Sequence, residues 1–62
     1  MTTGEKILAL REENNMTQQQ LADAIGFARS MVAQVERGSR PAPSYMVKKC
    51  SELFGVSADD LL

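Results

Sequence analysis

Helix start and stop signals recur along this chain and divide nearly all of it into short helical segments. Thr2 is followed three residues later by Glu5, and Thr17 by Gln20, which is the spacing of a capping box. A glycine, the residue that best accepts the left-handed backbone found at helix ends, follows several of the segments. We predict helices from Thr2 to the Asn14–Asn15 break, from Thr17 to Gly26, from Ala28 to Arg37 and from Ser44 to Phe54, with a last short turn from Ser57 to Leu62.

No stretch of the sequence alternates apolar and polar residues over the length of a strand, and no repeat is present. The expected fold class is therefore all-α, a compact domain of five short helices that occupies residues 1–62. Apolar residues at helical spacing are expected to form the core: Ile7, Leu10, Leu21, Ala22, Ile25, Val32, Val35, Met46, Val47, Cys50, Leu53 and Phe54.

The residue inventory excludes several kinds of site. Cys50 is the single cysteine and histidine is absent, so an internal disulfide and a Cys/His zinc site are excluded. We expect no metal and no cofactor, and Cys50 is expected to lie in the core. No apolar run approaches ~18 residues and no charged-then-apolar leader is present, so a cytoplasmic protein without membrane contact is expected.

The charges are unevenly distributed although the net charge is only -1. Residues 27–50 carry five basic side chains and one acidic side chain, whereas the rest of the chain carries two basic and seven acidic ones. A basic middle between acidic ends can orient a molecule on a polyanion. The same partition can also arise by chance, so the charge pattern alone does not assign a partner.

The second and third predicted helices are joined by only a few residues around Gly26. Two roughly perpendicular helices, a helix-turn-helix, satisfy so short a connection, and Ala22 supplies a small residue where they touch. The third helix then has two faces, with Val32 and Val35 on one of them. Its polar side chains lie together on the other face: Arg29, Ser30, Gln34 and Arg37. Ordinary surface helices have such a face, and so do helices that read DNA.

The stretch MTQQQLADAIGFARSMVAQVERG, residues 16–38, resembles the phage-repressor and Cro-like helix-turn-helix DNA-binding domains of the xenobiotic-response-element type. The T-Q-x-x-L-A opening and the E-R-G close carry the likeness, and KILALRE before them and LFGVSADDLL after them extend it over nearly the whole chain. The resemblance implies a lambda-repressor-like fold. It also implies a transcriptional regulator that binds double-stranded DNA sequence-specifically and most often acts as a repressor.

The resemblance places the third helix in the major groove, with its first residues against the base edges. The positions that match groove-facing positions are Ala28, Arg29, Ser30, Ala33 and Gln34. Arginine can donate two hydrogen bonds to guanine and glutamine can pair with adenine, so Arg29 and Gln34 are expected to carry most of the specificity. A solvated helix charge is the alternative for Arg29. Ala28 stands where relatives usually have serine or threonine, so this helix is expected to lack a side-chain cap.

Four further residues are expected to contact the phosphate backbone: Gln18, Arg37, Arg40 and Ser44. Gln18 matches the family's phosphate clamp at the start of the second helix, where free N–H groups favour an anion. The other three surround the loop that follows the third helix, and such contacts position a protein without reading sequence. Solvation in a flexible loop is the alternative for Arg40.

The family pairs an arginine of the first helix with a glutamate of the third, which here are Arg11 and Glu36. Both lie beside core positions, so we expect a structural ion pair at the edge of the core. Removal of one partner would leave the other charge stranded, at a cost of roughly 3–5 kcal/mol. The alternative is two separately solvated charges.

One recognition helix reads too few base pairs to select a site, so a homodimer on an inverted-repeat operator is expected, with weak self-association in the absence of DNA. The resemblance places the dimer contact near the last two helices, where the available apolar residues are Val56, Ala58, Leu61 and Leu62. Closing the small core is an equally good use for Leu61. No small-molecule ligand is expected.

Two other classes of function are alternatives. An antitoxin or adaptor would use the same fold to bind a partner protein through an apolar surface formed by Met1, Leu8, Leu61 and Leu62. An enzyme would need a nucleophile with a base, or paired carboxylates in a pocket. Asp59 and Asp60 are better explained as part of a helix start, so no catalytic residue is expected.

Overall fold

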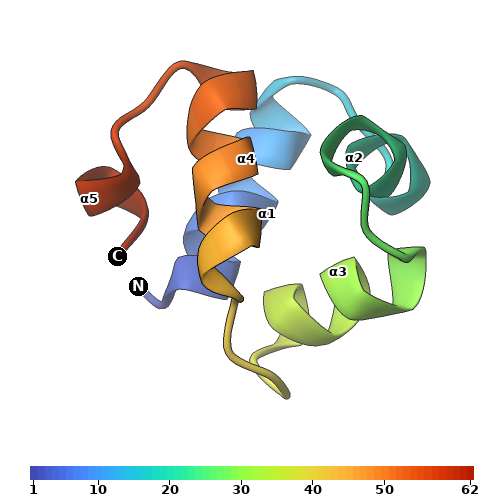
Figure 1. The fold of residues 1–62 in the computed structure, drawn as a ribbon. Helices are drawn as coiled ribbons and strands as arrows, with labels where there is room; N and C mark the ends of the chain where they lie inside the picture. Colours follow the sequence, from blue (N-terminus) through green and yellow to red (C-terminus); the bar gives the residue numbers. More distant parts are fainter.

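The computed structural model describes residues 1–62 and contains five α-helices and no strand (Figure 1). The helices are α1 (Thr3–Glu13), α2 (Gln18–Ile25), α3 (Arg29–Arg37), α4 (Ser44–Phe54) and α5 (Ala58–Leu61). The all-α prediction is confirmed, and the helix boundaries agree with those indicated by the cap and stop signals. None of the five helices has the length and apolar character needed to span a membrane.

Side-chain caps fix the starts of α1 and α2. Thr2 Oγ1 accepts a hydrogen bond from the Glu5 backbone N–H at 3.1 Å, and the Glu5 carboxylate accepts one from the Thr2 N–H at 2.8 Å. Thr17 and Gln20 form the same reciprocal pair, at 3.0 and 2.8 Å. Both predicted capping boxes are therefore present, and each satisfies two backbone donors that have no partner within the helix.

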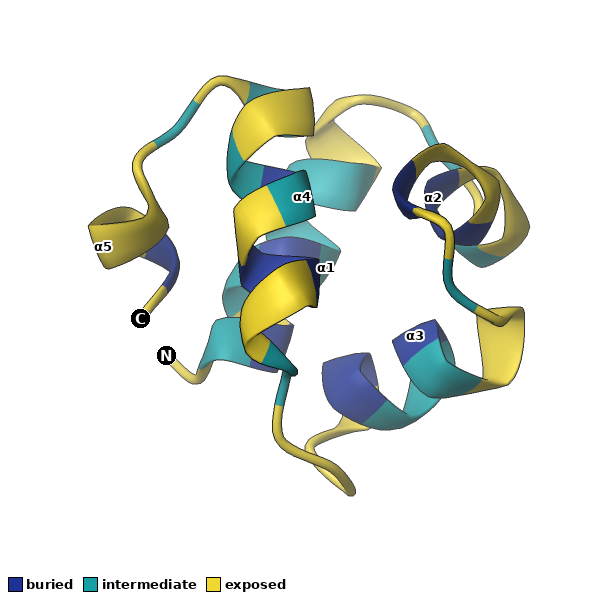
Figure 2. Cartoon of the chain, in the orientation of Figure 1, coloured by how far each residue is buried: buried dark blue, intermediate teal, exposed yellow.

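Ten apolar side chains form one buried core, and every helix contributes to it (Figure 2). α1 packs against α3 and α5, α2 packs against α3 and α4, and α4 packs against α5. The buried residues are Ile7, Leu21, Ala22, Ile25, Val32, Val35, Met46, Val47, Cys50 and Leu61. Cys50, the single cysteine, lies among them and forms no disulfide, so no covalent crosslink stabilises the fold. The burial of these apolar side chains between the helices is therefore the main source of stability.

The structure corrects the expectation for Leu53, which was predicted in the core but is 43% exposed on the last turn of α4. Of the two uses expected for Leu61, a dimer contact and closure of the core, the structure shows the second: Leu61 is 1% exposed where α5 meets α1 and α4. Leu10 and Phe54 are partly buried against the core. Cys50 is buried as predicted, and the loss of solvent raises the pKa of its thiol to about 11.

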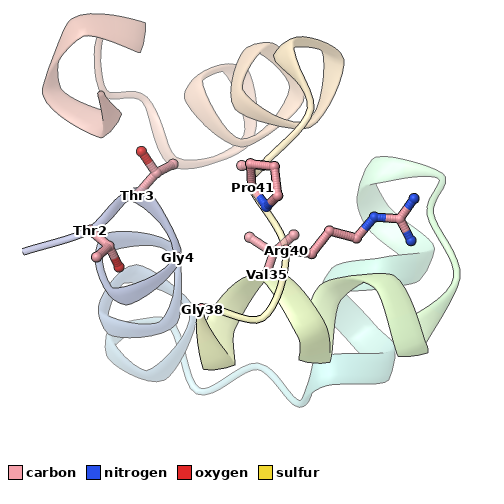
Figure 3. A pocket seen from close by; sticks show the side chains of 8 residues that line it. Thr2, Thr3, Gly4, Val35, Gly38, Arg40 and Pro41 are labelled. Atoms are coloured by element: carbon pink, nitrogen blue, oxygen red, sulfur yellow. The ribbon is translucent and has the colours of Figure 1, made fainter.

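Gly4 marks a close approach of α1 to α3 that the sequence did not reveal. A Cβ atom added at Gly4 would lie 1.9 Å from the carbonyl oxygen of Val35, so no side chain fits between the two backbones. Figure 3 shows this junction, with Gly4 beside the end of α3 and the loop that carries Arg40. This contact between backbones fixes how closely α3 is held against α1.

Candidate nucleic-acid interface

The two faces of α3 differ as the sequence predicted. Val32 and Val35 are buried in the core, whereas Arg29 and Ser30 are exposed on the outer side of the helix. Gln34 is partly buried. In Figure 1, α3 lies at the lower edge of the molecule and the other helices lie above it, so its outer face is free to meet a flat or grooved partner.

The turn between α2 and α3 sets the direction of α3. α2 ends at Gly26, whose φ of 77° is in the left-handed region that side chains disfavour. The N–H groups of Gly26 and Phe27 both donate to the Ala22 carbonyl oxygen, at 2.9 and 3.0 Å, which closes the turn. The Phe27 ring lies 6.1 Å from the Tyr45 ring of α4, so an aromatic contact holds the turn against a third helix.

The start of α3 has no side-chain cap. Ala28 occupies the N-cap position in an extended conformation. Its methyl side chain makes no capping hydrogen bond to the backbone of α3, as the sequence predicted. Its methyl group is exposed, as are the first two residues of the helix, Arg29 and Ser30. The Met31 N–H donates to the Ala28 carbonyl oxygen at 3.1 Å, so the backbone N–H groups left to solvent or to a bound partner are those of Arg29 and Ser30.

Arg11 and Glu36 form an ion pair between α1 and α3. Arg11 Nε donates to Glu36 Oε2 at 2.7 Å and Arg11 Nη2 donates to Glu36 Oε1 at 3.1 Å. Arg11 Nη1 also donates to the Met16 carbonyl oxygen at 2.7 Å. Glu36 is 7% exposed, and the hydrogen bond to it raises the pKa of Arg11 above its ordinary value. The pair therefore ties α1, α3 and the loop before α2 together.

Gln18 connects this ion pair to the outer face of α3. Its Nε2 donates to Glu36 Oε1 at 3.0 Å, and its Oε1 accepts a hydrogen bond from Arg29 Nη1 at 3.5 Å. These side chains border an open hollow of about 450 Å³ whose lining residues are Leu8, Arg11, Gln18, Arg29, Ala33, Glu36 and Arg37. With Glu36 paired by Arg11, the remaining guanidinium groups give the rim of this hollow a positive charge.

The other expected phosphate-contacting residues lie beyond this hollow or at its edge. Arg37, on its rim, donates from Nε to Ser39 Oγ at 2.9 Å, which restrains its exposed side chain. Arg40 lies in the loop after α3 and extends away from Thr2 (Figure 3). Ser44 is exposed in the first turn of α4, whose N-cap, a proline, makes no side-chain cap bond. The structure thus brings Gln18, Arg29 and Arg37 together and leaves Arg40 and Ser44 outside the group.

The residues expected at a dimer contact have different surroundings. Leu62 is 72% exposed and Ala58 is exposed, whereas Val56 is partly buried against the core. Leu62 and Ala58 border a hollow of about 270 Å³ between α4 and α5, with Ala42, Ser44, Val47 and Lys48 completing its lining. With Leu61 buried, the apolar surface left for a partner here consists mainly of Leu62 and its neighbours.

Comparison with known proteins gives a consistent match. The model of the family described as helix-turn-helix matches residues 7–61. The chain is 31% identical over 58 residues to the uncharacterized HTH-type transcriptional regulator YazB of Bacillus subtilis (strain 168), covering 94% of this chain and 84% of that protein. It is 33% identical over 60 residues to the control protein C.BamHI of Bacillus amyloliquefaciens, covering 95% of this chain and 74% of that protein.

A solved structure of SinR, the master regulator for biofilm formation, shares the fold. In its complex with DNA, SinR superposes with a TM-score of 0.87 at 30% identity, over 97% of each chain. A complex of SinR with SinI also matches, with a TM-score of 0.88 at 31% identity, covering 98% of this chain and 60% of that chain.

Proposed function

We propose that this chain, which belongs to the helix-turn-helix family, recognises a specific DNA sequence by placing the outer face of α3 in the major groove. Membership of this family makes the chain a DNA-binding transcriptional regulator and not an enzyme. The observation that carries the proposal is the division of α3 into a buried valine face and an exposed face that begins with Arg29 and Ser30. A recognition helix needs such an exposed polar face, because its side chains must reach the base edges in the major groove of DNA.

The readers of base edges lie along this face. Arg29 is the proposed guanine reader, because its guanidinium can donate two hydrogen bonds to O6 and N7, and Gln34 is the proposed adenine reader. Ser30 is a shorter polar contact. Ala28 and Ala33 leave room for the groove floor and offer methyl groups to thymine. Each good bidentate contact discriminates against a wrong base pair by about 1–3 kcal/mol.

Contacts to phosphate supply the affinity that is independent of sequence. We assign them to Gln18 and Arg37 on one side of α3, and to Arg40 and Ser44 in the loop and first turn that follow it. The uncapped start of α4 adds free backbone donors beside Ser44. Because the whole chain has a net charge of -1, we expect modest affinity per copy and a strong dependence on salt.

A second copy of the chain would supply the missing specificity. Two recognition helices related by a two-fold axis read half-sites about one helical turn apart, which requires an inverted repeat. Leu62, Ala58 and Val56 are the proposed dimer contact, with Leu61 supporting them from the core. Such a small apolar area predicts weak self-association that DNA binding strengthens. Occupancy of the operator in the cytoplasm would most simply repress transcription by blocking polymerase.

A role in binding a partner protein is the second candidate. Two observations favour it: the match to a chain of a SinR–SinI complex, of which this chain covers 60%, and the exposure of two apolar side chains, Met1 at 80% and Leu62 at 72%. Leu8 is only partly buried and could join such a surface. A stable stoichiometric complex that excludes DNA would favour this role over direct gene control.

Selection of bound duplexes from a random-sequence library tests the proposed function. We expect an inverted repeat to be enriched, and we expect Arg29→Ala and Gln34→Ala each to relax the preference at one position of each half-site. Arg37→Ala should instead weaken binding to all sequences and lower the salt slope by about one charge. If no sequence is enriched and salt abolishes binding of every variant alike, only electrostatic attraction is present and the proposal is wrong.

A further inference from the structure

α1 and α5 border an apolar hollow on the side of the molecule where the two chain ends lie (Figure 1). The hollow has a volume of about 300 Å³, and apolar side chains of both helices line it: Ala9 and Leu10 from α1, Val56 and Leu61 from α5. Met1, which is 80% exposed, also borders it. No segment of the chain covers this hollow, and an exposed apolar surface of this kind is a candidate contact surface.

Two opposite charges of α1 flank the apolar part of this surface. Four residues that border the hollow recur at the three- and four-residue spacing of one helix face, and together they are here called the α1 outer face: Lys6, Ala9, Leu10 and Glu13. Neither Lys6 nor Glu13 forms an ion pair within the chain. Asp60 of α5 adds one further carboxylate to the rim. Both charges of the α1 outer face are therefore free to pair with another molecule.

The order of residues on the α1 outer face makes it complementary to itself. The midpoint between Lys6 and Glu13 is also the midpoint between Ala9 and Leu10. A two-fold axis through this point lays a second α1 antiparallel to the first and sets each Lys6 beside Glu13 of the other copy. It also sets each Ala9 beside the other copy's Leu10, so that a small side chain faces a large one. Opposite charges across such a contact select the orientation of the partner.

The α1 outer face points away from the helix proposed to bind DNA. Gly4, Ile7 and Arg11 share the side of α1 that faces α3, where Gly4 meets the α3 backbone and Arg11 bonds to Glu36. At about 100° per residue, the α1 outer face is centred roughly 140° around the helix from that side. Two chains joined through this face would therefore hold their α3 helices on opposite sides of the pair, each directed outward.

We propose that the α1 outer face binds the same face of a second copy, antiparallel, and that the pair joins two separate DNA segments. The bridging of DNA rests on the proposed function, because it requires α3 to bind DNA, whereas the α1 contact itself does not. This contact is distinct from the proposed contact at Leu62, which would place two α3 helices on one duplex. It covers little more than one short helix, so it is weak between free chains. Several copies on each DNA segment strengthen it through avidity.

An exchange of charge between Lys6 and Glu13 tests the contact. Lys6→Glu and Glu13→Lys each bring like charges together across the two-fold axis, whereas the double variant restores opposite charges and keeps the wild-type net charge. Glu12→Lys is the matched control, because it makes the same change of charge at a neighbouring residue that does not border the hollow. The helix should tolerate these changes, since acidic side chains are favourable near its start and basic ones near its end. Circular dichroism checks that each variant is folded.

Two assays measure the expected effects. Sedimentation of free chains at concentrations up to millimolar gives the association constant. Capture of a labelled operator duplex by an unlabelled operator duplex on beads measures bridging. We expect each single variant to lose about tenfold or more in both assays, because the two-fold contact contains the altered pair twice. The double variant and Glu12→Lys should both remain within about twofold of wild type.

Other outcomes would overturn the proposal. If both single variants associate and bridge as wild type does, or if the double variant fails to recover, the α1 outer face is not the contact. If free chains follow the expected series but no labelled duplex is captured, the bridging of DNA is refuted. If one single variant does not fold, the other tests the same pair of charges. If the wild-type chain selects no DNA sequence, the proposed function has failed, and the series on free chains still decides whether the α1 contact exists.

Discussion

Replacing Gly4 by alanine should strongly destabilise the domain. The added Cβ would lie 1.9 Å from the Val35 carbonyl oxygen and 2.9 Å from its carbonyl carbon, and both atoms belong to backbone. Contact at about 3.4 Å would require the two helices to separate by more than an ångström, since backbone cannot rotate away as a flexible side chain can. Ile7 and Arg11 follow Gly4 on the same face of α1. Separation would therefore also disturb the core and the bonds to Glu36.

The magnitude follows from two opposed effects. Overpacking typically costs about 1–3 kcal/mol and occasionally more. The backbone clash and the shared face put Gly4→Ala at the upper end of that range, whereas the better helix propensity of alanine returns about 1 kcal/mol. We expect a net loss of about 2 kcal/mol, from a total stability of roughly 3–9 kcal/mol for a domain of this size. At about 4–8 °C per kcal/mol, the Tm should fall by roughly 8–16 °C.

Thermal and urea unfolding followed by circular dichroism measure this loss. Thr3→Ala is the control, because it changes the neighbouring residue in the same turn without placing an atom between the helices. It should leave the Tm within a few degrees of wild type. If Gly4→Ala is as stable as wild type, or more stable by the propensity gain, then the close approach of α1 and α3 does not restrict this position and the reasoning is refuted.

Three further substitutions probe single interactions. Arg11→Ala should lower the free energy of unfolding by roughly 3–5 kcal/mol, because it leaves the buried Glu36 carboxylate without its partner. The double variant Arg11→Met, Glu36→Leu should lose less stability, and equal losses in the two variants would show that no stranded charge is responsible. Ala28→Ser should add the missing cap and raise stability by about 0.5–2 kcal/mol in urea unfolding, and an unchanged midpoint would mean that the cap does not form. Hydrogen bonds from Thr2 lower the pKa of Glu5 below 4.5, so its contribution is present above pH 4.5 and lost as the pH falls below it. Glu5→Gln should therefore flatten the acid limb of the stability curve, and a parallel curve would contradict the linkage.

The features that could be predicted from the sequence are those encoded over a few residues. A capping box needs only Thr2 and Glu5 three positions apart, and the helical spacing of apolar residues indicates the buried face of each helix. These features depend little on how the helices are finally arranged. The pair of Arg11 and Glu36 is different, because it joins two helices and was expected only from the family resemblance; it is present in the structure.

The features that escaped prediction depend on which elements meet in space. Gly4 looks like an ordinary residue of a first helical turn until the backbone of α3 is placed against it. Leu53 and Leu61 have similar sequence surroundings, yet one is exposed and the other closes the core, because only one of them faces another helix. The contact of Gln18 with Arg29 joins residues 11 positions apart through side-chain directions that no spacing rule gives.

A loss of DNA binding can come from a lost base contact or from a less stable fold, and measurements of Tm distinguish the two. Glu36 supports the fold through its bonds from Arg11, so a change at either residue should weaken DNA binding by destabilising the chain. Arg29 is exposed, and its alanine variant should keep the wild-type Tm in the absence of DNA. DNA raises the stability of the wild-type domain by an amount that grows with ligand concentration over Kd. The Tm with and without operator DNA therefore separates variants that lose base contacts from variants that lose the ion pair. A variant such as Arg29→Ala keeps the wild-type Tm in the absence of DNA and loses the increase in Tm that DNA causes. A variant of Arg11 or Glu36 has a lower Tm already in the absence of DNA.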